Sequence, residues 1–263
     1  MRLHLELALV SQASCSVIPT DSILMKYTFK IAATVAIIAI AALLFWAIRS
    51  RKELTTEQIL TKTTTTYEIC HSYQDSGTVK SSTKDGGFSI NGTFTTAFIR
   101  PARFRYEFKG TMIVSVKNPI RKRDIHFIVW RQGKDTFEFY NLRNPSFRKA
   151  DSFEASIAGA TGISGGLTTL ITDLLLPTEF HPPFKLTDSK ENVRLKDGKI
   201  HNRDCYRISG MHYGSKMTFW IDKQTFLIRR MDWNGEIVNT TTREPSVNEN
   251  VVEEKLEYRM PQQ

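Results

Sequence analysis

The chain has 263 residues, enough for one large domain or two small ones, and 41% of them are hydrophobic, which is ample for a packed core. Disorder is therefore not the default for this chain. The formal net charge is +9, but residues 1–52 hold six basic and two acidic side chains, so the remainder has 30 basic against 25 acidic residues, a net charge of +5. These charges are mostly interspersed, so a solvated surface is favoured over a nucleic-acid footprint.

The first feature along the chain is an uncharged apolar stretch at residues 31–48, IAATVAIIAIAALLFWAI, which is long enough to span a bilayer. A cleaved signal peptide usually has a shorter apolar region and a small-x-small cleavage site, whereas here positive charge follows directly. Residues 25–52 are therefore interpreted as an N-terminal anchor with one transmembrane helix, and a cleaved signal segment is the alternative. Basic residues on both flanks leave its orientation undecided. Residues 1–24 are interpreted as an over-extended start or a disordered leader.

Beyond residue 52 the pattern is mainly that of short β-strands. They are rich in β-branched and aromatic residues and often alternate in polarity. The predicted strands cover residues 61–70, 94–99, 104–108, 112–117, 125–131, 136–140, 205–208, 217–222 and 226–231. Turn signals lie at residues 84–87, 132–134, 196–198 and 234–235. Many short strands at hairpin spacing predict an antiparallel sheet that curls or closes.

Residues 151–176, DSFEASIAGATGISGGLTTLITDLLL, interrupt the strand pattern. They predict two helical pieces hinged at residues 162–166, the second of which ends before Pro177. One face of this second piece is apolar and carries Leu167, Leu170, Ile171, Leu174 and Leu175. We expect these helices to cover the open face of the sheet, which would otherwise expose a large apolar surface.

The segment RPARFRYEF at residues 100–108 interleaves rings with cations. In a strand, Phe104, Tyr106 and Phe108 point to one face and the charged residues to the other. Proteins that stack bases on a sheet present rings and cations on the same exposed face, so this segregation favours an apolar container over nucleic-acid binding.

Arg100 differs from the other cations, because the period of the preceding strand from Phe94 through Phe98 points it toward the apolar face. A cation there needs acceptors. Backbone carbonyls or a carboxylate at the end of a covering helix would make Arg100 a latch between sheet and lid. The alternative is an edge arginine that reaches out to water.

Four segments resemble the periplasmic outer-membrane lipoprotein carrier (LolA-like) family. FIRPARFRYEF is similar to its Arg-Pro-x-x-Phe strand pair and VWRQGKDTFEFY to the following hairpin, with Gln132 in place of the hairpin aspartate. WIDKQTFLIRRM and VNENVVEEKLEYRMP resemble its C-terminal part. The motifs occur in the family's order and cover most of residues 55–260.

The resemblance implies an α+β fold, a half-open antiparallel β-barrel covered by a helical lid, over residues 53–263. It also implies a cavity that binds lipid or lipoprotein acyl chains, with Arg100 holding the lid and Phe104 at the mouth. Phe94, Phe98, Tyr106, Phe108 and the apolar residues of the second helix are the other expected lipid contacts. No catalytic residue and no cofactor are implied.

A carrier that is tethered by residues 31–48 cannot shuttle across the periplasm. The function expected from the sequence is therefore binding of acyl chains as an envelope carrier, acceptor or sensor. We expect the protein to be anchored in the inner membrane of a two-membraned bacterium with its body in the periplasm. A cleaved, soluble periplasmic form is the second choice.

The main rival is a serine hydrolase that acts on lipid esters. Gly162-Ile-Ser164-Gly-Gly166 fits the Gly-x-Ser-x-Gly nucleophile elbow, and His181, His201 and His212 follow it. That elbow, however, requires a preceding strand in a parallel α/β sheet, whereas here it interrupts a helical segment. The spacing of Cys and His residues predicts no metal site.

Cys70 and Cys205 each lie in a predicted strand beside a residue expected to point inward, Ile69 and Tyr206 respectively. Both thiols would then lie on the outer face of neighbouring strands, where an oxidising compartment could join them in a disulfide. Two unpaired buried thiols are the alternative. Neither reading is excluded by the sequence.

Overall fold

The computed structural model describes residues 38–40, 53–115, 120–141, 145–162, 167–179, 185–212 and 214–257. The chain forms two compact units, Met1–Glu53 and Leu54–Gln263. In the first unit residues 38–40 and Glu53 are described, and residues 38–40 are helical and exposed. The rest of the predicted anchor, residues 31–48, lies outside the described residues. Among the helices that are described, none has the length and apolarity needed to cross a membrane.

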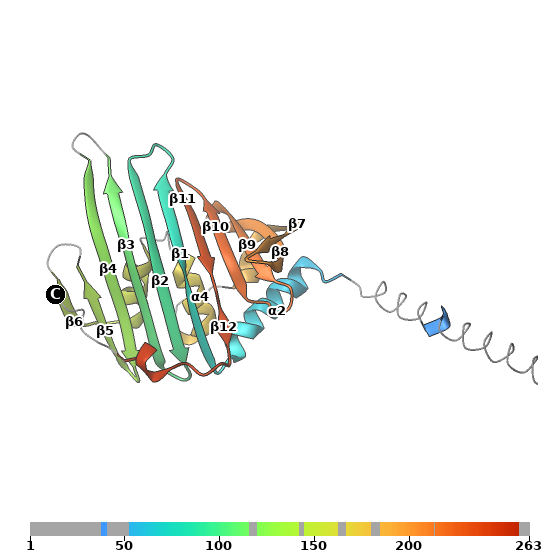
Figure 1. Cartoon of the computed structure of the whole chain (residues 1–263), viewed down its shortest axis with the longest axis horizontal. Helices are drawn as coiled ribbons and strands as arrows, with labels where there is room; N and C mark the ends of the chain where they lie inside the picture. Colours follow the sequence, from blue (N-terminus) through green and yellow to red (C-terminus); the bar gives the residue numbers. More distant parts are fainter. Residues whose placement is uncertain are drawn as a thin grey trace, which may run out of the picture. The chain divides into compact units, whose positions relative to one another are not determined.

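The second unit is built on one large, curved antiparallel sheet (Figure 1). Its strands are β1 (Ser72–Thr83), β2 (Phe88–Ile99), β3 (Arg103–Val114), β4 (Arg121–Gln132), β5 (Asp135–Tyr140), β6 (Ser146–Lys149), β7 (Lys190–Ile200), β8 (Arg203–His212), β9 (Ser215–Asp222), β10 (Ile228–Asn234), β11 (Ile237–Arg243) and β12 (Ser246–Val247). The order across the sheet is β6-β5-β4-β3-β2-β1-β11-β10-β9-β8-β7, and β12 pairs with β1. The predicted α+β class with an antiparallel sheet is confirmed.

Three of the four predicted turns connect neighbouring strands. Residues 84–87 join β1 to β2, residues 133–134 join β4 to β5, and residues 235–236 join β10 to β11. The turn predicted at residues 196–198 is wrong, because these residues lie inside β7 at a shift in its register with β8. The chain reverses instead at His201 and Asn202, both of which have positive φ angles.

The strand predicted at residues 61–70 is also wrong, because the chain there forms helix α2 (Thr56–Ile69). A capping box begins this helix: the Thr55 hydroxyl accepts from the Gln58 backbone N–H, and the Gln58 side chain accepts from the Thr55 backbone N–H. Its buried residues follow helical spacing along one face and are Ile59, Leu60, Thr63 and Tyr67. The β-branched threonines of this segment therefore gave a misleading strand signal.

The two predicted helical pieces are confirmed as α3 (Phe153–Thr161) and α4 (Leu167–Leu175). The hinge residues 163–166 between them lie outside the described part of the chain. Short 3₁₀ turns follow at η2 (Pro177–Glu179), η3 (Leu186–Asp188) and η4 (Glu253–Lys255). Side chains of α2, α3 and α4 share one hydrophobic core with one face of the sheet, which we call the inner face.

Gly77 lies on the inner face of β1, in register with Arg243 of β11 and Phe94 of β2. A Cβ atom at this position would lie 2.1 Å from the Thr242 carbonyl oxygen and 2.6 Å from the Phe94 ring. We expect Gly77→Ala to lower the free energy of unfolding by about 1–3 kcal/mol, since the strand and the ring must both shift. Urea unfolding measures this.

Gly162→Ala is the matched control, because a Cβ atom there meets no described heavy atom within 4 Å and the residue has a φ of −53°. Equal stability of the two variants would contradict the steric reading of Gly77.

Candidate functional site

The residues predicted to contact acyl chains come together on the inner face and the helices that cover it. Except for Arg100, each is at most 8% exposed, and all of these belong to one hydrophobic cluster. They are Phe94, Phe98, Phe104, Tyr106, Phe108, Leu167, Leu170, Ile171, Leu174 and Leu175. The structure thus places them at the interface between sheet and helices in a closed arrangement, so an acyl chain could reach them only by replacing helix contacts.

The contact between α3 and the sheet is aromatic. The ring of Phe153 meets Phe104 of β3 edge-on, with centroids 5.2 Å apart, and the guanidinium of Arg131 lies 5.0 Å from the Phe153 ring centre. Arg131 also pairs with Glu179 of η2 at 2.9 Å. The segment that contains α3 and α4 therefore ends in a 3₁₀ turn, η2, which an ion pair joins to the sheet.

Rings and charges separate on β3 as the strand period predicts. Phe104, Tyr106 and Phe108 are buried, whereas Glu107 on the opposite, outer face pairs with Arg105 and Lys109. A hydrogen bond from His126 is the largest cause that holds the pKa of Glu107 well below its usual value, and Lys109 and Arg105 lower it further. A carboxylate therefore partly offsets the outer cations of this strand, which does not suit a nucleic-acid surface.

Arg100 lies in the turn after β2 and holds the C-terminal end of α2. Its Nε donates to the Cys70 carbonyl at 2.7 Å, and its Nη2 donates to the carbonyls of Tyr67, at 3.1 Å, and Glu68. Backbone carbonyls at the end of a helix are thus its acceptors, as expected. The helix, however, is α2, which the sequence did not predict, and a cation at this end also complements the helix dipole.

Cys70 and Cys205 are both free and buried. The premise for joining them is wrong, because Cys70 ends α2 rather than a strand and its neighbour Ile69 is 74% exposed instead of pointing inward. Cys205 lies on β8, which pairs with β7 and β9. Burial raises the pKa of both thiols, that of Cys205 to about 11, so both are protonated and unreactive at neutral pH.

A buried charged pair, which sequence reasoning missed, lies on the same inner face. The Nη1 atom of Arg243 donates to Oδ2 of Asp75, and both side chains are fully buried. The Tyr73 hydroxyl donates to the same carboxylate oxygen at 2.6 Å, and the guanidinium lies 4.6 Å from the ring centre of Phe94. Burial works against the charge on Arg243, but the attraction of Asp75, together with that of Tyr73 and Tyr67, outweighs it and raises the pKa of Arg243.

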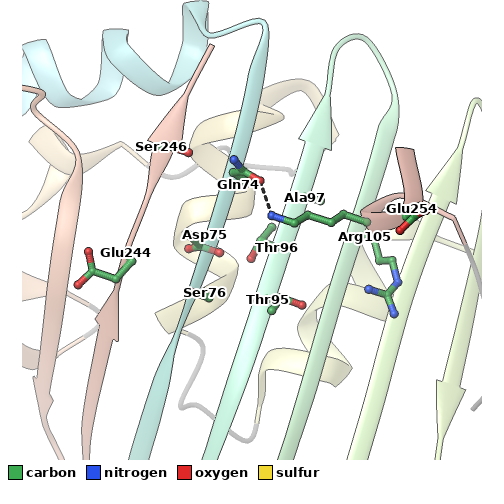
Figure 2. A pocket seen from close by; sticks show the side chains of 11 residues that line it. Gln74, Asp75, Ser76, Thr95, Thr96, Ala97, Arg105, Glu244, Ser246 and Glu254 are labelled. Carbon is green, nitrogen blue, oxygen red and sulfur yellow. Dashed lines mark hydrogen bonds between the residues drawn. The ribbon is translucent and has the colours of Figure 1, made fainter. Parts of the chain in front are cut away.

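The outer face carries a pocket of about 560 Å³ that is open to solvent (Figure 2). Small side chains form its floor on β1 and β2, among them Ser76, Thr95 and Ala97. Lys255 of η4 also lines it and donates to the Gln74 side chain at 2.7 Å. This pocket lies beneath the C-terminal segment and is lined by none of the predicted lipid contacts.

The elements around the Gly-x-Ser-x-Gly motif differ from those that a hydrolase nucleophile elbow needs. Ser164 and His181 lie outside the described residues, but the chain before them is helix α3 rather than a strand, and every strand pairing described is antiparallel. His201 lies in the turn before β8 and His212 at the far end of that strand. No group of three or more metal-ligating side chains converges within the described ranges.

His212 is 5% exposed at the end of β8 and packs edge-on against Phe219. Burial lowers its pKa to about 4, so the folded state binds fewer protons than the unfolded state between that value and the ordinary 6.5. Stability should therefore be lost as the pH falls through this window, by roughly 2 kcal/mol from His212 alone between pH 7.5 and 5.

The His212→Gln variant should lose correspondingly less stability than the wild-type chain between pH 7.5 and 5. Thermal unfolding at a series of pH values measures this. Parallel curves for the two proteins would contradict the assignment.

No known protein family matches this sequence, and a search of curated proteins finds no significant relative. Solved structures with partial similarity include LprF from Mycobacterium bovis, at 12% identity over 75% of this chain and 94% of that one, with a TM-score of 0.43. MucA/MucB from Pseudomonas aeruginosa gives 9% identity, 78% and 61% coverage and a TM-score of 0.40. A LolA superfamily protein from Nitrosomonas europaea gives 11%, 78% and 99%, with a TM-score of 0.25. At these scores the similarities assign no function to this chain.

Proposed function

We propose that the body of the protein binds the acyl chains of a lipid or lipoprotein between the inner face of the sheet and helices α3 and α4. In this proposal the sheet is a half-open barrel and the helices are its lid. The protein would act as an acceptor, donor or sensor in the cell envelope, held at the inner membrane by residues 31–48 with its body in the periplasm.

The observation that carries the proposal is that two short helices, α3 and α4, cover the aromatic inner face of the sheet. Helices α3 and α4 have nine residues each. Isolated helices of that length are marginal in water, so they depend on apolar contacts with the sheet. An acyl chain offers the sheet the same kind of contact, and it can therefore compete with the helices for Phe104 and its neighbours.

The resemblance of the segment around Arg100 to the lipoprotein-carrier motif supports the same conclusion. Arg100 fixes the end of α2, and α2 contacts α4. Arg100 can thus hold the helices closed, while its own side chain does not fill the apolar interface. A cavity with a movable cover requires such a residue. No nucleic acid, metal or cofactor is needed for this function.

Site-specific photocrosslinking in cells tests the proposal on the intact chain. Benzoylphenylalanine would replace Phe104, which is fully buried under α3, or Phe147 of β6, which is 42% exposed, as the matched control. After illumination, we expect a lipid or lipoprotein adduct at position 104 and none at position 147, identified by mass spectrometry. Absence of an adduct at position 104, or equal adducts at both positions, would reject lipid binding at this interface.

A further inference from the structure

The charged pair beneath the helices belongs to a larger buried cluster, formed by Tyr73, Asp75, Thr96, Tyr106 and Arg243. Asp75, Thr96 and Tyr106 are direct neighbours across β1, β2 and β3, and Arg243 lies one inner-face row away on β11. Tyr73, Tyr106 and Arg243 are fully buried, Thr96 is 3% exposed and Asp75 is 5% exposed. This cluster is a buried polar region within the otherwise aromatic inner face.

Several polar atoms of the cluster lack a hydrogen-bond partner among the described residues. For Arg243 these are Nε and Nη2, for Asp75 the Oδ1 atom, and for Thr96 the hydroxyl oxygen. Nε and Nη2 lie on the same edge of a guanidinium group, and that edge can donate two parallel hydrogen bonds. Nη1 alone serves Asp75. Within the described part of the chain, the cluster therefore holds an unpartnered donor edge on Arg243, on the side of the guanidinium opposite Nη1, and an unpartnered acceptor on Asp75.

Helix α4, which covers the inner face, also carries buried polar side chains. Thr168 and Thr172 of α4 lie one turn apart and are both buried, beside the apolar residues of that helix. Burial raises the pKa of Tyr106, and the Thr168 side chain opposes part of that rise. When α4 moves away from the sheet, the aromatic surface and the polar cluster become accessible together.

We propose that this cluster binds the uncharged ester or amide linkage of an acyl ligand. The carbonyl oxygen of the linkage accepts from the Nε and Nη2 edge of Arg243, and an adjoining hydroxyl or amide hydrogen donates to Oδ1 of Asp75. The surrounding rings, such as Phe94, contact the acyl chain. This inference rests on the proposed function and adds the chemistry by which one acyl compound is distinguished from another.

The charge of the site favours an uncharged ligand group over a carboxylate. Arg243 and Asp75 together carry no net charge, so a carbonyl can bind without leaving an excess charge in the interior. A fatty-acid anion would add a buried negative charge next to Asp75, which is costly in a low-dielectric environment.

Competitive displacement of a fluorescent apolar probe, N-phenyl-1-naphthylamine, tests the inference. The full chain would be kept in solution by a fluorinated surfactant, whose tails mix poorly with hydrocarbon. The competitors are monolaurin, laurate and dodecane, which have chains of the same length and differ in the polar group. For the wild-type protein at about pH 8, we expect monolaurin to displace the probe at concentrations about tenfold or more below those of laurate and dodecane.

The double variant Asp75→Val/Arg243→Met removes both charges and roughly conserves volume, and it should bind all three competitors within about twofold of one another. Arg103→Met/Glu253→Val is the matched control, since it removes a similar ion pair from the outer face and should keep the preference. Thr96→Val removes the hydroxyl between Asp75 and Tyr106, which has no hydrogen-bond partner in the described ranges and is a third polar contact for the linkage, and it should reduce the preference for monolaurin several-fold even where the double variant fails to fold.

The outcomes separate this inference from the proposed function. If no competitor displaces the probe from the wild-type protein, or the probe does not bind, the proposed function fails and the inference fails with it. If all competitors bind but the preference is absent, or survives in both the double variant and Thr96→Val, lipid binding stands and the inference is overturned. A preference for laurate that depends on Arg243 would also overturn it, in favour of a carboxylate site.

Discussion

Arg243→Met is expected to lower the free energy of unfolding by about 3–5 kcal/mol, because it leaves the Asp75 carboxylate buried without its counter-ion. Asp75 keeps only the Tyr73 hydroxyl as a hydrogen-bond donor among the described residues. The fully buried position of both side chains prevents water from solvating the remaining charge. Chemical denaturation followed by tryptophan fluorescence measures the loss.

The double variant Asp75→Val/Arg243→Met should recover most of this stability, because it removes both charges and returns the site to the apolar character of its surroundings. Arg103→Met provides the comparison for an exposed pair, since Arg103 and Glu253 are 33% and 63% exposed, and it should cost less than about 1 kcal/mol. A loss below about 1 kcal/mol for Arg243→Met would show that the pair is solvated or not formed.

The sequence failed to predict five strands, β1, β6, β7, β11 and β12, and buried polar residues explain the failure for β1 and β11. The inner positions of β1 include Asp75 and Ser81, and those of β11 are Asn239, Thr241 and Arg243. Strand prediction relies on apolar residues at every second position, and here polar residues occupy the buried positions. The failure in β1 and β11 therefore coincides with the part of the inner face for which we propose a binding role.

The other elements show where local patterns suffice. In β3 the alternation of three rings with charges placed the aromatic face correctly. In α4 the leucine spacing gave the helix, but the structure buries eight of its nine residues rather than one side. The segment of α2 misled because four consecutive threonines favour strands locally, whereas the capping box at Thr55 and the contacts of Tyr67 stabilise a helix. Because α2 was not predicted, the helix that accepts hydrogen bonds from Arg100 was not predicted either.

Arg100→Leu should increase the rate at which a bound acyl probe is released by about one to two orders of magnitude, while leaving the fold intact. The substitution removes three hydrogen bonds to the last carbonyls of α2 and a favourable charge at that end of the helix. Arg100 is half-buried, so water can replace part of what is lost and the sheet itself is not disturbed. The effect should therefore appear in ligand exchange more than in stability.

Stopped-flow release of a fluorescent fatty-acid ester from the full chain measures this effect. Arg103→Leu is the matched control, because this nearby arginine pairs with Glu253 on the outer face rather than with the end of α2. Its release rate should equal that of the wild-type protein. Arg100→Lys should fall between the two, because an ammonium keeps the charge near the helix end but does not reproduce the spread of guanidinium donors. Equal release rates for Arg100→Leu and the wild-type protein would mean that α2 does not control access to the inner face, and that Arg100 serves only to end the helix.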